Sequence, residues 1–246
     1  MPPRGPLRRL VEVSPDLLVA TSRRDTTTTS VVRAAPGSHE VLLVDPSWEV
    51  DELEALADDL DTLGLTVVAG FSTHAHFDHL LWHPRFGDVP RWASATTVAV
   101  AAATRDILLD ELGPWPEALV PLVGDVAAAR SSRLAWGGQE VALVEHSGHV
   151  PGHTALWLPG PRILLAGDML SDVEPPLPAA DDSSLRAYAA GLDTLEPFVR
   201  QAALLMPGHG HATQDAAARL AADRRFVEAV ASGSSPASVD GRCSPA

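Results

Sequence analysis

Short apolar runs separated by turn residues open the chain. These runs, rich in Val and Leu, cover residues 7–13, 17–21, 30–34 and 40–44. The alternation of apolar runs with turns predicts a meander of β-strands. Residues 48–63 then place Leu53, Leu56 and Leu60 at helical spacing with acidic residues opposite, which predicts an amphipathic helix.

Strands and helices alternate over the rest of the chain, which is typical of an α/β fold. The pattern predicts a strand at residues 65–69, further strands at 89–93, 154–158, 162–166 and 202–206, a hairpin of 132–136 with 140–145, and helices at 95–112, 185–200 and 214–230. Residues 171–184, acidic and rich in proline, predict a surface loop. The Ser-, Pro- and Gly-rich composition of residues 232–246 predicts a disordered tail. We expect residues 1–231 to form a single domain.

Candidate chemistry begins directly after the strand at 65–69. His74, His76, Asp78 and His79 lie within six residues. On an extended backbone His74 and His76 point to the same side, because side chains alternate with period 2. Neutral imidazole and carboxylate suit zinc and neighbouring first-row metals, so this stretch predicts a metal site, the alternative being a solvated loop without a role.

Three further strands end in groups of the same kind. His149 and His153 follow the strand at 140–145, Asp168 follows 162–166, and His209 follows 202–206. Glycines stand beside these residues, as expected where a metal centre needs close backbone approach. The same pattern of buried strand, small residue and metal ligand thus occurs four times in the chain.

Composition and charge narrow the class of protein. Acidic residues number 32 against 18 basic ones, a formal charge of −14, so nucleic acid would be repelled. Every basic residue is Arg, which excludes lysine nucleophiles and Schiff bases. Cys243 is the single cysteine, so no disulfide framework is expected. No long apolar segment occurs, so we expect a soluble cytoplasmic protein with a small-molecule substrate and no membrane partner. No pattern defines an oligomeric state.

Taken in order, the ligand motifs resemble those of the metallo-β-lactamase superfamily of hydrolases. The motifs are His74-Ala75-His76-Phe77-Asp78-His79, Ser147-Gly148-His149-Val150-Pro151-Gly152-His153, Gly167-Asp168 and Pro207-Gly208-His209. The resemblance covers roughly residues 10–230. It implies an α/β fold built as a four-layer αββα sandwich of the metallo-β-lactamase type.

The same resemblance implies a dinuclear metal site. One metal would be held by His74, His76 and His149, and a second by Asp78, His79 and His209, with Asp168 bridging. Two zinc ions are expected, with Mn or Fe possible. His153 is expected outside the ligand shell, in a hydrogen bond that orients a ligand.

The chemistry expected of such a centre is hydrolysis. A water shared by two zinc ions is a hydroxide near neutral pH, which attacks a carbonyl, and Asp78 would orient it as the catalytic residue. We expect a small ester, thioester or lactone as substrate. A β-lactam or amide hydrolase, a mononuclear iron oxygenase and a non-catalytic metal or ligand sensor are the alternatives. The roles of His83, Trp82 and Trp115 stay open: His83 suits a pocket entrance or a cap, and the Trp side chains suit a pocket wall or ordinary packing.

Overall fold

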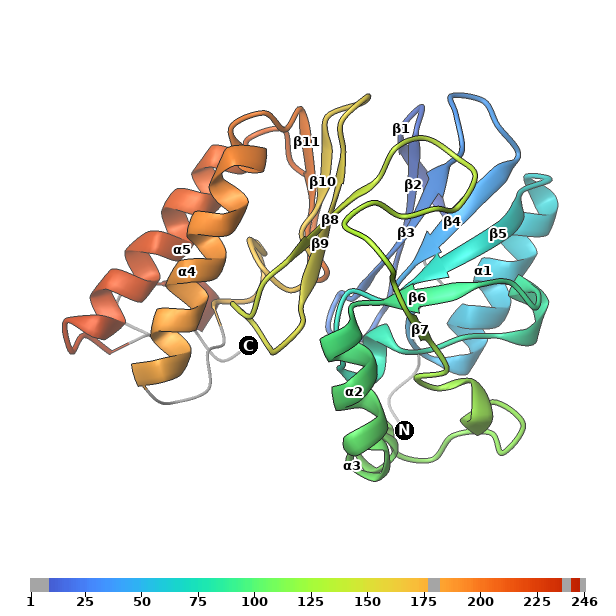
Figure 1. Ribbon diagram of the computed structural model, residues 1–246, viewed down its shortest axis with the longest axis horizontal. Coiled ribbons are helices and arrows are strands. Elements are labelled where there is room, and N and C mark those ends of the chain that lie inside the picture. The colour runs from blue at the N-terminus through green and yellow to red at the C-terminus, as the bar shows by residue number, and fades with distance from the viewer. Residues whose placement is uncertain (1–8, 177–181, 236–239, 244–246) are drawn as a thin grey trace. The chain divides into compact units, whose positions relative to one another are not determined.

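The computed structural model describes residues 9–176, 182–235 and 240–243. They form two compact units (Figure 1). The N-terminal unit contains Met1–Arg130 and Leu134–Gln139, and the C-terminal unit contains Ser131–Arg133 and Glu140–Ala246. The predicted strand at 7–13, loop at 171–184 and tail at 232–246 each extend partly outside the described residues. The assignment of residues 1–231 to one domain stays a prediction.

The N-terminal unit is built on a seven-stranded sheet. In spatial order its strands are β1 (Val11–Ser14), β2 (Leu17–Thr21), β3 (Thr28–Arg33), β4 (Glu40–Val44), β5 (Thr66–Phe71), β6 (Arg91–Ala93) and β7 (Ala127–Ala128). Strands β1 to β4 pair antiparallel, as the meander predicted, and β4 to β7 pair in parallel. The parallel pairing brings the carboxyl ends of β4 and β5 to one edge, where open α/β sheets commonly place their sites.

Helix α1 (Val50–Thr62) connects β4 to β5 and covers the sheet of the N-terminal unit (Figure 1). Its predicted apolar face is confirmed, because Leu53, Leu56 and Leu60 are buried in one cluster with Val41 and Leu43 of β4. Burial of each leucine stabilises the unit by about 1.5–3 kcal/mol. The helix therefore fixes the strand pair that ends in the candidate site.

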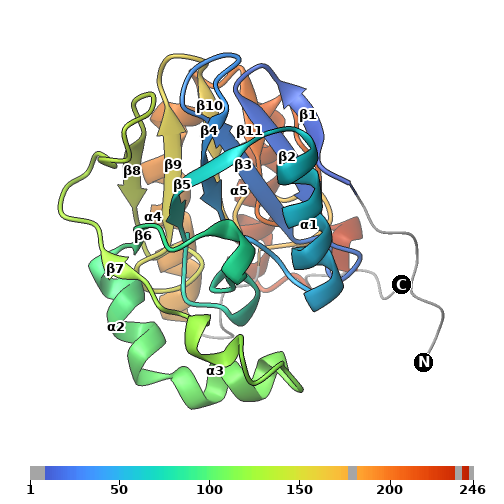
Figure 2. The ribbon, with the colours of Figure 1, turned by 90° about the vertical axis from the view of Figure 1, so that its right-hand side faces the viewer.

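The single helix predicted at 95–112 is wrong in one respect, because the chain breaks it at Thr104. The structure has α2 (Ala95–Ala103) and α3 (Arg105–Leu112), which Figure 2 shows as two successive coils. The backbone of Thr104 has a φ of −110°, which is not helical. The hydroxyl of Thr104 donates to the carbonyl of Val100 at 2.9 Å. Threonine side chains compete with the helical backbone in this way. Short 3₁₀ turns η1 (Phe77–His79), η2 (Pro84–Phe86) and η3 (Val120–Leu122) complete this unit.

The C-terminal unit is a four-stranded sheet covered by two helices. Its strands, β8 (Ala142–Glu145), β9 (Thr154–Leu158), β10 (Ile163–Leu165) and β11 (Leu204–Met206), lie in the order β11-β10-β9-β8. Helices α4 (Asp182–Val199) and α5 (Ala216–Ala231) lie side by side on one face of this sheet (Figure 1). Leu164 of β10, Leu192 of α4 and Phe226 of α5 share the buried core. A last 3₁₀ turn, η4, spans Gly241–Cys243.

The hairpin predicted for 132–136 with 140–145 is confirmed only as one antiparallel bridge between Arg133 and Ala142, because β8 pairs along its length with β9. Residues 134–139 belong to the N-terminal unit, where Gln139 donates its backbone N–H to Ala34 at 2.8 Å and its side-chain amide to Arg33 at 2.7 Å. Gln139 is thus bonded within the N-terminal unit, and the predicted pairing does not extend past Arg133. Each unit nevertheless holds a sheet and helices, which confirms the α/β class.

Candidate metal centre

The loop that follows β5 brings its four predicted ligands together. His74 Nε2 lies 3.0 Å from His76 Nδ1, and His79 Nε2 lies 3.5 Å from Asp78 Oδ2. The rings of His74 and His79 are 4.3 Å apart between centroids. His74 and His79 are fully buried, so their orientations are set by packing and hydrogen bonds.

A carboxylate that the sequence reasoning missed, Asp45, holds this loop. It directly follows β4 and is buried, and its Oδ1 accepts the backbone N–H of Thr73 at 2.8 Å. Its Oδ2 accepts the Thr73 hydroxyl at 2.6 Å and lies 3.0 Å from His79 Nδ1. Its position at the end of a buried strand, which the other candidate ligands share, was the only signal for it in the sequence.

These contacts determine which imidazole nitrogens carry protons. His79 Nδ1–H donates to the Asp45 carboxylate, which leaves a lone pair on His79 Nε2. Because the Thr73 hydroxyl donates to Asp45, its oxygen accepts Nδ1–H of His74 at 3.0 Å. Nε2 of each ring therefore carries a lone pair that can bind a metal. Metal-ligating histidines commonly have this arrangement, because their other ring nitrogen donates its proton to a group behind the ligands.

Asp78 is fixed by a second hydroxyl group from the same sheet. Thr27, fully buried just before β3, donates its hydroxyl to Asp78 Oδ2 at 3.0 Å. The bond holds Asp78 Oδ2 in place, 3.5 Å from Nε2 of His79.

In the C-terminal unit one carboxylate oxygen faces two histidines. Asp168 Oδ2 lies 3.5 Å from His149 Nε2 and 3.3 Å from His209 Nε2. The other nitrogen of His209, Nδ1, lies 3.4 Å from Glu174 Oε1, which orients the ring. The three ligands predicted in this unit therefore converge, and a shared oxygen is what a bridging carboxylate needs.

The ligand spacings fit a first-row divalent metal. A tetrahedral ion with bonds of about 2.0–2.1 Å places neighbouring ligand atoms about 3.3 Å apart. The separations within the two units, 3.0, 3.5, 3.5 and 3.3 Å, lie around that value. The candidate ligands are buried or half-buried imidazole and carboxylate groups, a donor set that zinc, manganese and iron share.

His153 is hydrogen-bonded to the backbone of a candidate ligand. Its Nε2 accepts the backbone N–H of Asp168 at 3.0 Å, and its Nδ1 lies 3.2 Å from Nε2 of His146. His146 in turn accepts the N–H of Gly148 at 3.1 Å. This histidine pair joins the loop before His149 to the backbone of Asp168.

The remaining histidines have local roles. His83 precedes η2 and accepts the backbone N–H of Arg85 at 3.4 Å, which supports the capping role. His211 is exposed and lies 3.0 Å from Asp172. Burial alone would raise the pKa of Asp172, but hydrogen bonds from Arg219 and His211 hold it at about 2.

We expect His146 to make the metal-free protein sensitive to acid. Burial lowers the pKa of His146 to about 4, whereas an unfolded histidine titrates near 6.5. The unfolded state binds the proton first, so stability is complete above about pH 6.5 and falls as the pH drops toward 4, by about 3 kcal/mol.

Urea unfolding of the metal-free chain at pH 7.5 and 4.5 measures this loss. His146→Gln should reduce the loss of unfolding free energy between the two pH values, and the exposed His39→Gln should not. An equal loss in wild type and His146→Gln would show that His146 is not the group that titrates.

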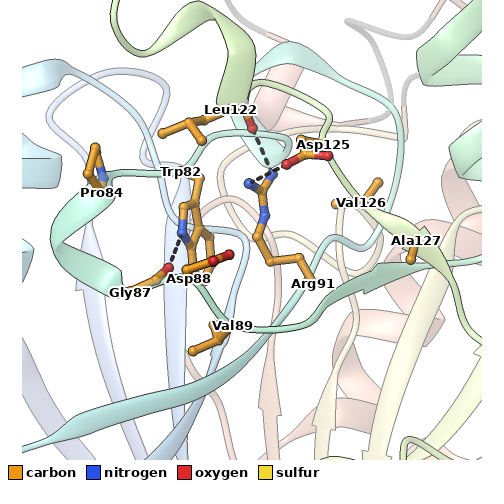
Figure 3. A pocket seen from close by; sticks show the side chains of 10 residues that line it. All are labelled: Trp82, Pro84, Gly87, Asp88, Val89, Arg91, Leu122, Asp125, Val126 and Ala127. Carbon is orange, nitrogen blue, oxygen red and sulfur yellow. Dashed lines mark hydrogen bonds and ion pairs between the residues drawn. The ribbon is translucent and has the colours of Figure 1, made fainter.

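A cavity of about 460 Å³ lies elsewhere in the N-terminal unit, lined by Trp82, Arg91, Asp125 and neighbouring residues (Figure 3). The Arg91 guanidinium stacks on the Trp82 ring, 4.9 Å from its centroid, and donates to the carbonyl of Leu122 at 2.7 Å. Burial lowers the pKa of Arg91 to about 10, and Asp125 opposes that shift. Trp82 therefore walls a cavity whose lining includes none of the candidate metal ligands.

Fold and donor sets together define an α/β protein with candidate sites for divalent metal, and comparison with known proteins gives the family. The model of the metallo-beta-lactamase superfamily matches residues 23–209. The chain belongs to this superfamily, which confirms the resemblance. No curated protein matches the chain.

Solved structures show the same fold at low identity. The chain is similar to the DIM-1 metallo-beta-lactamase exposed to ceftazidime, with a TM-score of 0.68, 19% identity, and 92% of this chain and 98% of that chain covered. A metallo-beta-lactamase from Pontibacter korlensis has a TM-score of 0.65 and 21% identity, with 87% of this chain and 95% of that chain covered. A metallo-beta-lactamase family protein from Thermus thermophilus has a TM-score of 0.64 and 22% identity, with 89% of this chain and 83% of that chain covered. These likenesses confirm the predicted fold type.

Among the described residues, no helix has both the length and the apolar character needed to cross a membrane.

Proposed function

We propose that this chain is a metal-dependent hydrolase that cleaves a small ester, thioester or lactone. The observation that carries the proposal is the spacing of the candidate ligand atoms, 3.0 to 3.5 Å within each unit. Membership of a superfamily rich in metal-dependent hydrolases supports it.

The proposed ligand assignment follows the order of the family motifs. His74, His76 and His149 would hold one zinc ion, and Asp78, His79 and His209 the second. Asp168 would bridge both through the oxygen that faces His149 and His209. Manganese or iron are the alternative occupants, because the donor set suits them as well.

When bound, the metal ions would lower the pKa of a shared water and polarise the substrate carbonyl. The chain's own residues then decide the geometry. Asp78, held by the Thr27 hydroxyl, orients the attacking water and accepts its proton. Asp45 keeps the imidazoles of His74 and His79 in the tautomers whose Nε2 atoms carry no proton, as metal binding requires.

The partner class we propose is a small molecule in the cytoplasm. The formal charge of −14 disfavours a nucleic-acid substrate, since phosphate backbones would be repelled. Arg is the cation available for a substrate carboxylate, because the chain has no Lys.

Loss of Asp78 should strongly reduce turnover while the fold persists. In a panel of esters, thioesters, lactones and β-lactams, we expect the zinc-loaded protein to hydrolyse an ester, thioester or lactone. Asp78→Ala should reduce that rate by about 10²–10⁴-fold, the range found when a proton-transfer group is lost. Asp88→Ala, in the same unit but lining the cavity of Figure 3, is the matched control and should keep the rate.

The same panel separates the alternatives. Hydrolysis of β-lactams or amides alone would replace the proposed substrate class. Oxygen consumption by protein that holds one iron per chain would indicate an oxygenase. Metal binding without turnover of any panel member would contradict the proposed hydrolysis and favour a sensor.

A further inference from the structure

A buried carboxylate in α5 is tied to the strand end that carries Asp168. Asp223 is fully buried and accepts the backbone N–H of Leu170 at 3.1 Å, the Tyr188 hydroxyl at 2.8 Å and Arg242 at 2.9 Å. A buried charge of this kind is stable only with a partner of opposite charge and further donors. Arg242 supplies the positive charge that balances the Asp223 carboxylate.

Arg242 lies in the segment that the sequence assigns to a disordered tail. Besides Asp223, its guanidinium donates to the backbone carbonyl of Ser171 at 2.6 Å and is held by Asp240. The Ser171 hydroxyl donates to the backbone carbonyl of His209 at 2.8 Å. Arg242 is thus connected by hydrogen bonds to the segments that present two candidate ligands, Asp168 and His209.

The segment after Asp168 needs such support. Gly167 has a φ of 54° and Leu170 a φ of 62°. The left-handed conformation is costly for a residue with a side chain, so Leu170 adopts it only when neighbouring contacts impose it. The bond from Leu170 N–H to Asp223 is a contact of that kind, and Arg242 keeps Asp223 in place.

We propose that Arg242 is a positioning residue for the metal centre, acting through Asp223 and Ser171 on the backbone that carries Asp168 and His209. A metal ligand must be held within about 0.5 Å of its productive position, so a small loosening of this backbone weakens metal binding. The inference rests on the proposed function, because it assumes that Asp168 and His209 bind metal.

Metal titration of the full chain tests the inference. Zinc affinity is measured by competition with a chromophoric chelator, beside urea unfolding of the metal-free protein. Arg242→Gln should weaken zinc binding by about 10–100-fold, the usual effect of losing an outer partner of a metal ligand. Arg242→Lys should recover most of the affinity, because an ammonium group can donate to both Asp223 and Ser171. Arg200→Gln, which removes an exposed ion pair with Glu196 in the same unit, is the matched control and should bind zinc normally.

Unchanged zinc affinity in Arg242→Gln would overturn the inference, even if its unfolding midpoint fell, because the contact would then serve the fold alone. Should Arg242→Gln fail to fold, the double variant Asp223→Asn with Arg242→Gln removes both charges together. It still lacks the bond to Ser171, so its zinc affinity should fall, and wild-type affinity would overturn the inference. A wild-type chain that binds no zinc would contradict the proposed function itself.

Discussion

Asp45→Asn should bind divalent metal about 100-fold more weakly than the wild type, although Asp45 is not a proposed ligand. The aspartate accepts Nδ1–H of His79 and, through the Thr73 hydroxyl, determines the proton on His74. An asparagine turns one of these acceptor positions into a donor. With an N–H facing its Nδ1, His79 must carry its proton on Nε2, which removes a metal-binding lone pair.

A comparable tautomer reversal in serine proteases lowers kcat by about 10⁴-fold without changing the geometry. We therefore expect Asp45→Asn to lose most of its hydrolysis rate while its secondary structure and its unfolding midpoint change much less. Zinc affinity by chelator competition measures the effect, and Asp61→Asn, an exposed partner of Arg85 in the same unit, is the control. Wild-type zinc affinity in Asp45→Asn would show that Asp45 does not set the tautomers.

Gly208→Ala should lose more than about 100-fold in metal affinity, since it displaces a proposed ligand and not merely a ligand's partner. A Cβ at position 208 would lie 2.1 Å from Asp168 Oδ1 and 2.9 Å from the carbonyl carbon of Gly167. The backbone N–H of Gly208 also donates to the carbonyl of Gly167 at 2.6 Å, so the two segments cannot move apart without losing this bond. The Asp168 carboxylate would have to turn away from His149 and His209.

Gly160→Ala is the matched control for this substitution, because a Cβ at that position meets no atom within 4 Å. Zinc stoichiometry and affinity of the two variants should differ, with Gly160→Ala behaving as the wild type. Full zinc binding by Gly208→Ala would mean that the Asp168 carboxylate is not needed in its present position.

The predicted ligands were accessible from the sequence because each follows a buried strand and belongs to a recognisable motif. His74 and His76 meet as their period-2 spacing requires, and Asp168 meets His209 because β10 and β11 pair in parallel. Local pattern and strand direction were enough for these residues.

The residues that support the ligands were harder to predict. Asp45 lacks a neighbouring histidine, so its position after β4 indicated only a strand end. Arg242 lies in a Ser-, Pro- and Gly-rich stretch typical of disorder, and its role depends on Asp223, 19 positions earlier in α5. The break at Thr104 accompanies a side-chain hydrogen bond to Val100 that apolar periodicity does not show. The bonds that Asp45 and Arg242 make join segments far apart in the chain, and such bonds leave no local signal.

The most direct test of the proposed function is the metal content of the purified protein after reconstitution with zinc and removal of free metal. Elemental analysis should give two zinc ions per chain, together with hydrolysis of an ester, thioester or lactone that stops when the zinc is removed by chelation. One iron per chain with oxygen consumption, or no tightly bound metal at all, would contradict the proposed dinuclear hydrolase.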